Sequence, residues 1–191
     1  VMGSSCEMMI ASLAEPAMIM IVFTIALIVG STQLSSISAY TASHEVGLRV
    51  SLALSLVALL MVAIAENGRI PIDNPATHLE LTMVHEAMVL EYSGRHLAMI
   101  ELAASLKLVL YVSLIACIFV PWGMAPPGAG IAGYAIGFAA YLGKLLAGGI
   151  LLALFEMAIA KMRVFRYAEF LGAALMLGLL GTLLVFISKS L

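Results

Sequence analysis

Five long apolar stretches, separated by short polar segments, leave this chain few places to fold other than a lipid bilayer. They cover residues 8–30, 47–65, 97–120, 131–160 and 167–187. A helix needs about 20 mainly apolar residues to cross the hydrocarbon core, so each stretch is a candidate transmembrane helix. The second stretch is short for this purpose, and the fourth is long enough that it must tilt or protrude.

The composition agrees with a membrane protein, because 63% of the residues are hydrophobic and only 10% are charged. A soluble domain has about 25% charged residues. We therefore predict an all-α integral membrane protein, with a single membrane domain over residues 1–191. No basic patch indicates nucleic acid binding. The first turns contain Glu7 and no positive segment, so we expect no cleavable signal peptide.

The two cysteines give no sign of a redox centre. Cys6 and Cys117 are isolated, and the chain has no CxxC pair. No cluster of ligands has the spacing of an iron–sulfur, haem or zinc site. We therefore expect no cofactor and no metal in this chain, so that any redox chemistry belongs to a partner.

Positive residues predict the orientation in the membrane. The loop after the second span contains Arg69 and Arg95, and the loop after the fourth contains Lys161, Arg163 and Arg166. The turn after the third span, PWGMAPPGAG, contains no positive residue. Since Lys and Arg collect on the cytoplasmic side, we predict a multi-pass protein of the cytoplasmic membrane with segment 66–96 in the cytoplasm.

Segment 66–96 is also the acidic part of the chain. Five of the 11 Asp and Glu residues lie here, namely Glu66, Asp73, Glu80, Glu86 and Glu91. Charge is costly beside a bilayer, so this concentration indicates a functional site. Pro71 and Pro75 prevent a continuous helix, which predicts a folded cytoplasmic loop.

A short amphipathic helix should follow this loop, from about residue 77 to 92. Thr77 and Glu80 have the spacing of a capping box before an apolar run. Glu80 and Glu91 then share one face, and Arg95 extends it if the helix is unbroken; the alternative is that Gly94 ends the helix. This acidic row would suit an entrance for protons or cations. The alternative is a solvated helix face on which Glu80 is only a cap.

Three charged residues lie inside the predicted spans. Glu15 lies about two turns into the first span, beside Pro16, and its structural alternative is a carboxylate near the interface. Lys107 and Lys144 are central in the third and fourth spans, too deep to reach either surface easily. Buried lysines exchange protons readily. The structural alternative is that each lysine neutralises a carboxylate of a neighbouring helix.

The loop contains a motif that resembles a known family. AENGRIPIDNP followed by LEYSG is similar to the signature of the proximal membrane subunit shared by respiratory complex I and the membrane-bound nickel–iron hydrogenases. The matching positions are Glu66, Arg69, Pro71, Asp73, Pro75, Glu80 and the run 91–94. A second match, over residues 3–15, places Glu15 on the last position of the family pattern.

Differences from this pattern favour one branch of the family. Complex I subunits have PEAE where this chain has PATH at 75–78, and the interval from Glu80 to Glu91 is three residues longer here. Both features resemble the hydrogenase branch, of the formate hydrogenlyase subunit 4 type. Cys6 replaces the usual Arg. The family has eight spans, so the resemblance implies that this chain is the C-terminal part of such a subunit.

The resemblance implies a subunit that couples electron transfer, from formate or ferredoxin to protons, to translocation of H⁺ or Na⁺. Nickel–iron and iron–sulfur centres are expected in peripheral partner subunits, next to antiporter-like membrane subunits. Glu15, Glu66, Glu80 and Glu91 would carry the ions. Arg69, together with Asp73 and Arg95, would hold the loop and its docking surface.

Other functions stay open at this point. A quinone-site subunit of a complex I-type dehydrogenase fits the same signature. A passive anchor for a peripheral oxidoreductase would explain the loop but not Glu15, Lys107 and Lys144. A self-sufficient secondary transporter is less favoured, because the chain shows no inverted repeat.

Overall fold

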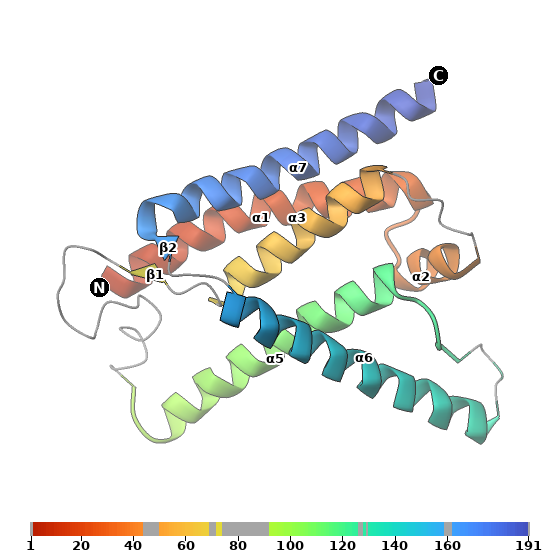
Figure 1. Ribbon diagram of the computed structural model, residues 1–191, viewed down its shortest axis with the longest axis horizontal. Coiled ribbons are helices and arrows are strands. Elements are labelled where there is room, and N and C mark those ends of the chain that lie inside the picture. The colour runs from red at the N-terminus through yellow and green to blue at the C-terminus, as the bar shows by residue number, and fades with distance from the viewer. Residues whose placement is uncertain are drawn as a thin grey trace.

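The computed structural model describes residues 2–43, 50–68, 72–73, 92–125, 128, 130–158 and 162–190. Its helices are α1 (Met2–Val29), α2 (Leu34–Ser43), α3 (Val50–Glu66), α5 (Arg95–Phe119), α6 (Ile131–Ala158) and α7 (Val164–Ser190). Two very short strands, β1 (Ile72–Asp73) and β2 (Met162–Arg163), complete the described elements. The chain is therefore all-helical apart from one pairing of two residues with two (Figure 1).

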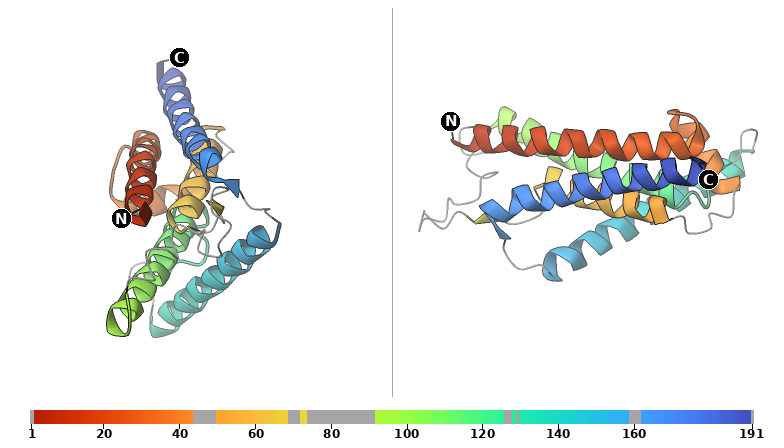
Figure 2. Two further views of the ribbon diagram at one scale, coloured as in Figure 1. Left: turned by 90° about the vertical axis from the view of Figure 1, so that its left-hand side faces the viewer. Right: turned by 90° about the horizontal axis from the view of Figure 1, so that it is seen from above.

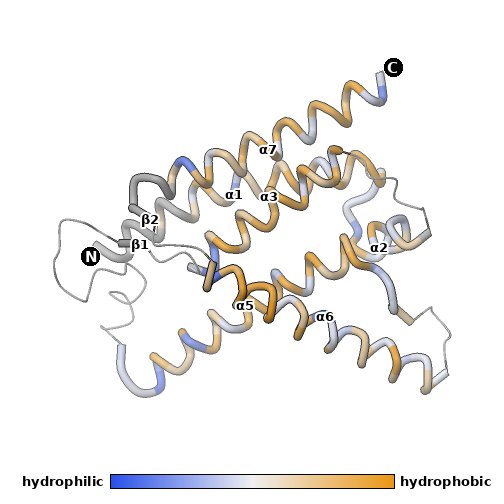
Figure 3. The backbone as a smooth tube through the Cα atoms, viewed as in Figure 1, coloured by the Kyte–Doolittle hydropathy of each residue, from blue (hydrophilic) through white to orange (hydrophobic). Residues whose placement is uncertain are grey.

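Four of the described helices are long and apolar enough to cross a membrane: α1, α5, α6 and α7. α3 is apolar but has only 17 residues, as expected for the short second span. Figure 3 shows that apolar residues dominate along all five helices. The prediction of an all-α integral membrane protein is confirmed, and a helix lies in each of the five predicted ranges.

The helices alternate in direction, so the polar loops gather at two ends of the molecule. α1, α5 and α7 run one way, and α3 and α6 run the other (Figure 1). The end of α3, the start of α5 and the junction between α6 and α7 consequently lie at the same end. This end therefore carries the described residues of the two loops, Asp73 and Arg163, which the sequence placed on one side of the membrane.

α1, α3 and α7 form a three-helix bundle that contains most of the buried residues. The three helices lie side by side in Figures 1 and 2 and make the most extensive contacts in the molecule. Their fully buried side chains are small or aliphatic, and include Ala14, Ala17, Ile21, Ala58, Leu59, Val62, Leu171 and Ala174. Small residues let helix backbones approach closely, which is the main source of packing energy between helices in a bilayer.

Two glycines of α7 mark its closest approach to the other bundle helices. A Cβ added to Gly178 would lie 3.3 Å from the Cβ of Met20 on α1. A Cβ added to Gly181 would lie 3.5 Å from Ser51 and Ser55 of α3. The buried Thr24 hydroxyl donates to the Met20 carbonyl at 2.8 Å, so this polar group is satisfied within the apolar interface.

α5 and α6 form a separate pair that touches the bundle only lightly. The two helices cross beside the bundle (Figure 1), and α5 contacts α2 and α3 as well as α6. All residues of α6 are described, and none of its side chains is buried. α5 buries only Tyr111 and Ile118. The apolar surfaces of this pair therefore face outward.

α2 is an element that the sequence analysis did not predict. This serine-rich helix lies between the first two spans and has ten residues. Ile37 is buried in the main core, and the buried Thr41 hydroxyl donates to the Ile37 carbonyl at 3.0 Å. The helix is anchored by one buried side chain and has no long apolar face. Its sequence signal is therefore weaker than that of a membrane span.

The pairing of β1 with β2 joins two loops that are far apart in the sequence. The strands are parallel, with Ile72 opposite Met162 and Asp73 opposite Arg163. The acidic loop after α3 is therefore fixed to the start of α7. The predicted amphipathic helix from about residue 77 to 92 lies outside the described residues.

Candidate functional site

The signature begins where α3 ends, and its first three residues explain why the helix stops there. Glu66 is the last residue of α3, and the following Asn67 and Gly68 form its C-terminal cap. The Asn67 side-chain amide donates to the Ala63 carbonyl at 2.7 Å, and the Gly68 amide donates to the Ala65 carbonyl at 3.0 Å. Gly68 has a φ of 61°, a left-handed conformation that glycine adopts without strain.

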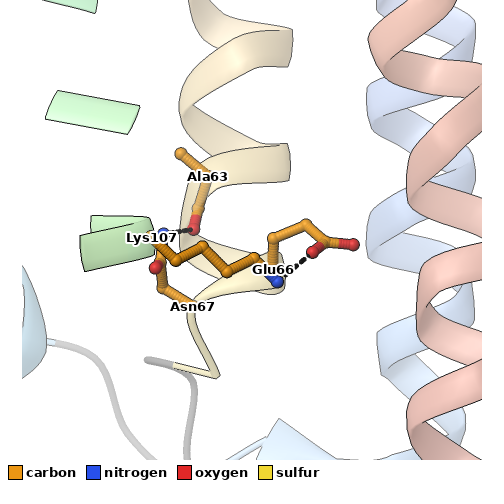
Figure 4. Close-up of polar contacts among 4 residues, drawn as sticks. All are labelled: Ala63, Glu66, Asn67 and Lys107. Atoms are coloured by element: carbon orange, nitrogen blue, oxygen red, sulfur yellow. Dashed lines mark hydrogen bonds and ion pairs between the residues drawn. The ribbon is translucent and has the colours of Figure 1, made fainter. Parts of the chain in front are cut away.

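An ion pair connects this helix end to α5. The Lys107 ammonium lies against the Glu66 carboxylate, and Figure 4 shows it reaching across the end of α3. The side chain of Glu66 is 14% exposed and that of Lys107 is 42% exposed. The more deeply placed partner is therefore the carboxylate, which the structure holds between helices.

The position of Glu66 makes its charge dependent on this lysine. The C-terminal end of a helix carries a partial negative charge, so a carboxylate in the last turn is disfavoured by the dipole. An adjacent ammonium reverses that penalty, and in a medium of low dielectric the attraction is stronger than in water. The pair therefore places opposite charges where the end of α3 meets α5.

Tyr111 extends this site along α5. It follows Lys107 by four residues, which places both on one face of the helix, and its side chain is buried. Its hydroxyl group is within range of the Glu66 charge. The sequence analysis missed Tyr111, although its spacing of four from a lysine inside a span was a usable signal.

Lys144 has a partner of a different kind. Its ammonium donates to the carbonyl of Val120, at the C-terminal end of α5, over 2.6 Å. The sequence placed this lysine too deep to reach a polar group at a helix end, and the crossing of α5 and α6 provides one. Lys189 makes a similar bond to the Leu27 carbonyl at the end of α1, over 2.5 Å.

Glu15 is not brought to the ion pair by any described contact. Its side chain is exposed on α1, next to the buried Ala14 and the exposed Pro16. The carboxylate therefore lies on the outer face of the bundle. Its predicted role in an ion path remains a prediction.

The remaining predicted site residues are only partly described. Arg69, Glu80 and Glu91 lie outside the described residues. Asp73 is placed by its backbone, in register with Arg163 across the parallel strand pair. Opposite charges at facing positions of the two loops agree with a docking role for this corner, which no contact yet tests.

Arg95 belongs to α5 and does not continue the acidic helix. It is the first residue of α5 and is exposed, and Gly94 before it has a φ of 58°. This left-handed residue breaks the helical direction before Arg95, so the unbroken helix on which the extension to Arg95 depended is not present. Arg95 instead lies at the entrance of the third span.

Among the described residues, no three His, Cys, Asp or Glu side chains gather as metal ligands would. The features that the described part does bring together are a charged pair, a buried tyrosine and lysine-capped helix ends. They lie in and between four long apolar helices and a shorter one. These features define a multi-pass integral membrane protein with ionisable groups between its helices.

The chain belongs to the NADH dehydrogenase family, whose family model matches residues 1–187. Formate hydrogenlyase subunit 4 of Escherichia coli (strain K12) is 29% identical over 163 residues, covering 85% of this chain and 52% of that protein. Hydrogenase-4 component C of the same strain is 34% identical over 123 residues, covering 64% of this chain and 38% of that protein. The resemblance drawn from the loop signature is thereby confirmed.

This chain spans about half the length of the first of these curated relatives and less of the second. Both relatives are components of hydrogenase systems by name, and the family name refers to a complex I-like oxidoreductase. A multi-pass membrane protein of this family is what the similarities and the apolar helices together show.

Proposed function

We propose that this chain is a membrane subunit of a multi-subunit hydrogenase complex, in which it couples electron transfer to the translocation of protons or sodium ions. The electrons pass from formate or ferredoxin to protons in peripheral subunits, which hold the nickel–iron centre and the iron–sulfur clusters. The chain itself carries no redox centre. Antiporter-like membrane subunits are its neighbours in the cytoplasmic membrane, and segment 66–96 faces the cytoplasm.

The observation that carries this proposal is the Glu66–Lys107 ion pair. Its carboxylate stands at the first matching position of the family signature, and its ammonium comes from inside the third span. A passive anchor has no need for a charged pair between membrane helices, because two charges removed from water cost several kcal/mol unless they compensate each other. A carboxylate that gains and loses protons during ion transfer does need a positively charged partner of this kind.

A change in the protonation of this ion pair can couple the redox reaction in the peripheral subunits to ion movement in the membrane. When Glu66 accepts a proton, the attraction to Lys107 is lost, and the ammonium becomes free to move away from the end of α3. When Glu66 loses the proton, the pair forms again. Movement of the signature loop by a docked redox subunit would change the separation of the two charges and so drive this exchange.

The other predicted residues take places along this path. Glu80 and Glu91 receive ions at the loop, Glu15 passes them at the outer face of α1, and Lys144 is a second candidate deeper in the α5–α6 pair. Arg69, Asp73 and Arg95 hold the loop and present it to the peripheral subunits. The similarity to Formate hydrogenlyase subunit 4 and Hydrogenase-4 component C supports this branch over a quinone-site subunit.

The decisive experiment replaces Glu66 with Gln in the assembled complex. Glutamine keeps the size and the hydrogen bonds of the side chain but cannot titrate. Ion pumping into sealed vesicles should fall by about a hundredfold, the typical contribution of one acid–base group. Hydrogenase activity with an artificial dye should persist, because that reaction takes place in the peripheral subunits.

The matched control is Glu101→Gln, which removes an exposed carboxylate of α5 and should leave pumping unchanged. Glu15→Gln and Glu91→Gln test the rest of the line in the same vesicles. If all of these variants assembled and pumped like the wild type, the carboxylates would be structural and the chain would be an anchor. Bound quinone in the purified complex would instead favour the dehydrogenase alternative.

A further inference from the structure

The two halves of α5 are covered to different extents, and the Glu66–Lys107 ion pair lies where they meet. Lys107 is the thirteenth of the 25 residues of α5. Within this fully described helix, no side chain from Arg95 to Leu106 is buried, whereas Tyr111 and Ile118 are buried in the second half. The ion pair therefore lies at the boundary between an open and a closed half of the helix.

The open half extends past the end of α3. α3 ends at Glu66, beside the middle of α5, and Figures 1 and 2 show the first half of α5 continuing beyond this end. On the face of α5 that carries Lys107, the preceding turn contributes Ala103 and Ala104, both exposed. Their methyl groups leave space for water or a hydrated ion to approach the ammonium from this side.

The closed half begins one turn beyond the ion pair, with Tyr111. This residue lies about 6 Å further along the helix axis than Lys107, on the same face of α5. Tyr111 is 9% exposed. On α3, the turn before Glu66 is closed as well, because Val62 and Ala63 are buried. The approach that is open on one side of the ion pair is therefore blocked on the other.

The hydrophobic core continues this closure along α5. Ile115, one turn after Tyr111, packs against the core cluster, and Ile118 belongs to that cluster. Ser113 and Cys117, which are polar groups of this half of α5, instead line a groove toward α6. A path for water along the Lys107 face of α5 is therefore interrupted at the tyrosine.

We propose that Tyr111 closes the ion-pair site on its far side, so that Glu66 and Lys107 exchange ions only from the end that carries segment 66–96. The aromatic ring provides the barrier, because it fills the face of α5 that the two alanines leave open one turn earlier. This role rests on the ion path proposed above, since a barrier matters only where ions move. A site that opens to one side at a time prevents the transported ion from leaking back.

The first test measures access to α5 in the intact complex in sealed vesicles. A cationic, membrane-impermeant methanethiosulfonate is added to one side of the membrane at a time, and mass spectrometry gives the labelling of each cysteine separately. Ala103→Cys should react from the side of segment 66–96 alone. Ile115→Cys should react at least about tenfold more slowly from either side, because burial that raises a thiol pKa by one unit lowers the reactive thiolate fraction tenfold.

Variants of Tyr111 separate the ring from the hydroxyl group. Tyr111→Ala removes the ring, so labelling of Ile115→Cys should rise about tenfold by the same thiolate argument, and an imposed proton gradient should decay faster in vesicles without substrate. Tyr111→Phe keeps the ring and should match the wild type in both measurements. Tyr134→Ala removes an exposed tyrosine of α6 and should change neither. Hydrogenase activity with an artificial dye shows that each variant is assembled.

Three results would overturn the proposal. Comparable labelling of Ala103→Cys and Ile115→Cys with Tyr111 in place would show that the site is not closed, and this comparison needs no Tyr111 variant to assemble. Unchanged labelling in Tyr111→Ala would show that other side chains form the barrier. Labelling in Tyr111→Phe as high as in Tyr111→Ala would assign the closure to the hydroxyl group. The pumping of Glu66→Gln tests the ion path separately, because labelling and gradient decay are measured without turnover.

Discussion

The α1–α3–α7 bundle and the α5–α6 pair are both built from apolar helices, yet they use their surfaces in opposite ways. The bundle buries small residues such as Ala17, Ala58 and Ala174 between closely packed backbones. The pair buries little, and α6, which is described throughout, buries nothing. The charged partners Lys107 and Lys144 both belong to the pair. The comparison indicates that the bundle provides most of the buried packing, whereas the pair keeps its apolar side chains at the outside.

The largest effect is expected where the bundle is tightest. Gly178→Leu should destabilise the protein by about 3 kcal/mol, because its side chain would enter the contact with Met20. Thermal unfolding in detergent measures the change. Gly172→Leu on the same helix is the control, since no described atom lies within 4 Å of the added Cβ. Equal losses in the two variants would contradict the tight packing of α7.

The ion pair that bridges the two regions should have the next largest effect. Lys107→Met leaves the Glu66 carboxylate without compensation, and should cost about 2 kcal/mol of stability. Adding Glu66→Gln should recover part of this loss, because the uncompensated charge is then absent. A double-mutant cycle by thermal unfolding gives the coupling directly. Additive losses would mean that the two charges do not interact.

The smallest effect is expected inside the pair. A Cβ added to Gly148 would lie 2.6 Å from the Val112 side chain, whereas at Gly149 no described atom lies within 4 Å. Both alanine variants gain the same helix propensity. Gly148→Ala should therefore be less stable than Gly149→Ala by about 1 kcal/mol. A difference as large as that of the Gly178 variants would show that α5 and α6 pack as tightly as the bundle.

The spans could be predicted from the sequence because membrane insertion depends on local apolar length. Lys107 was identified as an unusual charge from its own span alone. Its partner could not be identified, since Glu66 lies 41 positions away and only the packing of α5 against α3 brings them together. The alternative that a lysine neutralises a carboxylate of a neighbouring helix therefore describes Lys107. For Lys144, the partner is a main-chain carbonyl, which has no sequence signature.

Other features depended on pairing that local patterns do not encode. The strands β1 and β2, which place Asp73 opposite Arg163, have only two residues each. Such short strands cannot show the alternation of apolar and polar residues that would predict them from the sequence. The short helix α2 is held by Ile37 rather than by an apolar face. Gly94 was recognised as a possible end of the acidic helix, and its left-handed conformation assigns Arg95 to α5.

The order of the bundle helices along the chain has a consequence for biosynthesis. α7 makes the most extensive contacts with both α1 and α3, yet it follows α5 and α6 in the sequence. Since a chain emerges from the ribosome starting at its N-terminus, α1 and α3 enter the membrane before their main partner exists. The faces around Ala17 and Ala58 must therefore remain in contact with lipid, or with an assembly factor, until α7 is made. The α5–α6 pair is inserted during this interval, before the α1–α3–α7 bundle is complete.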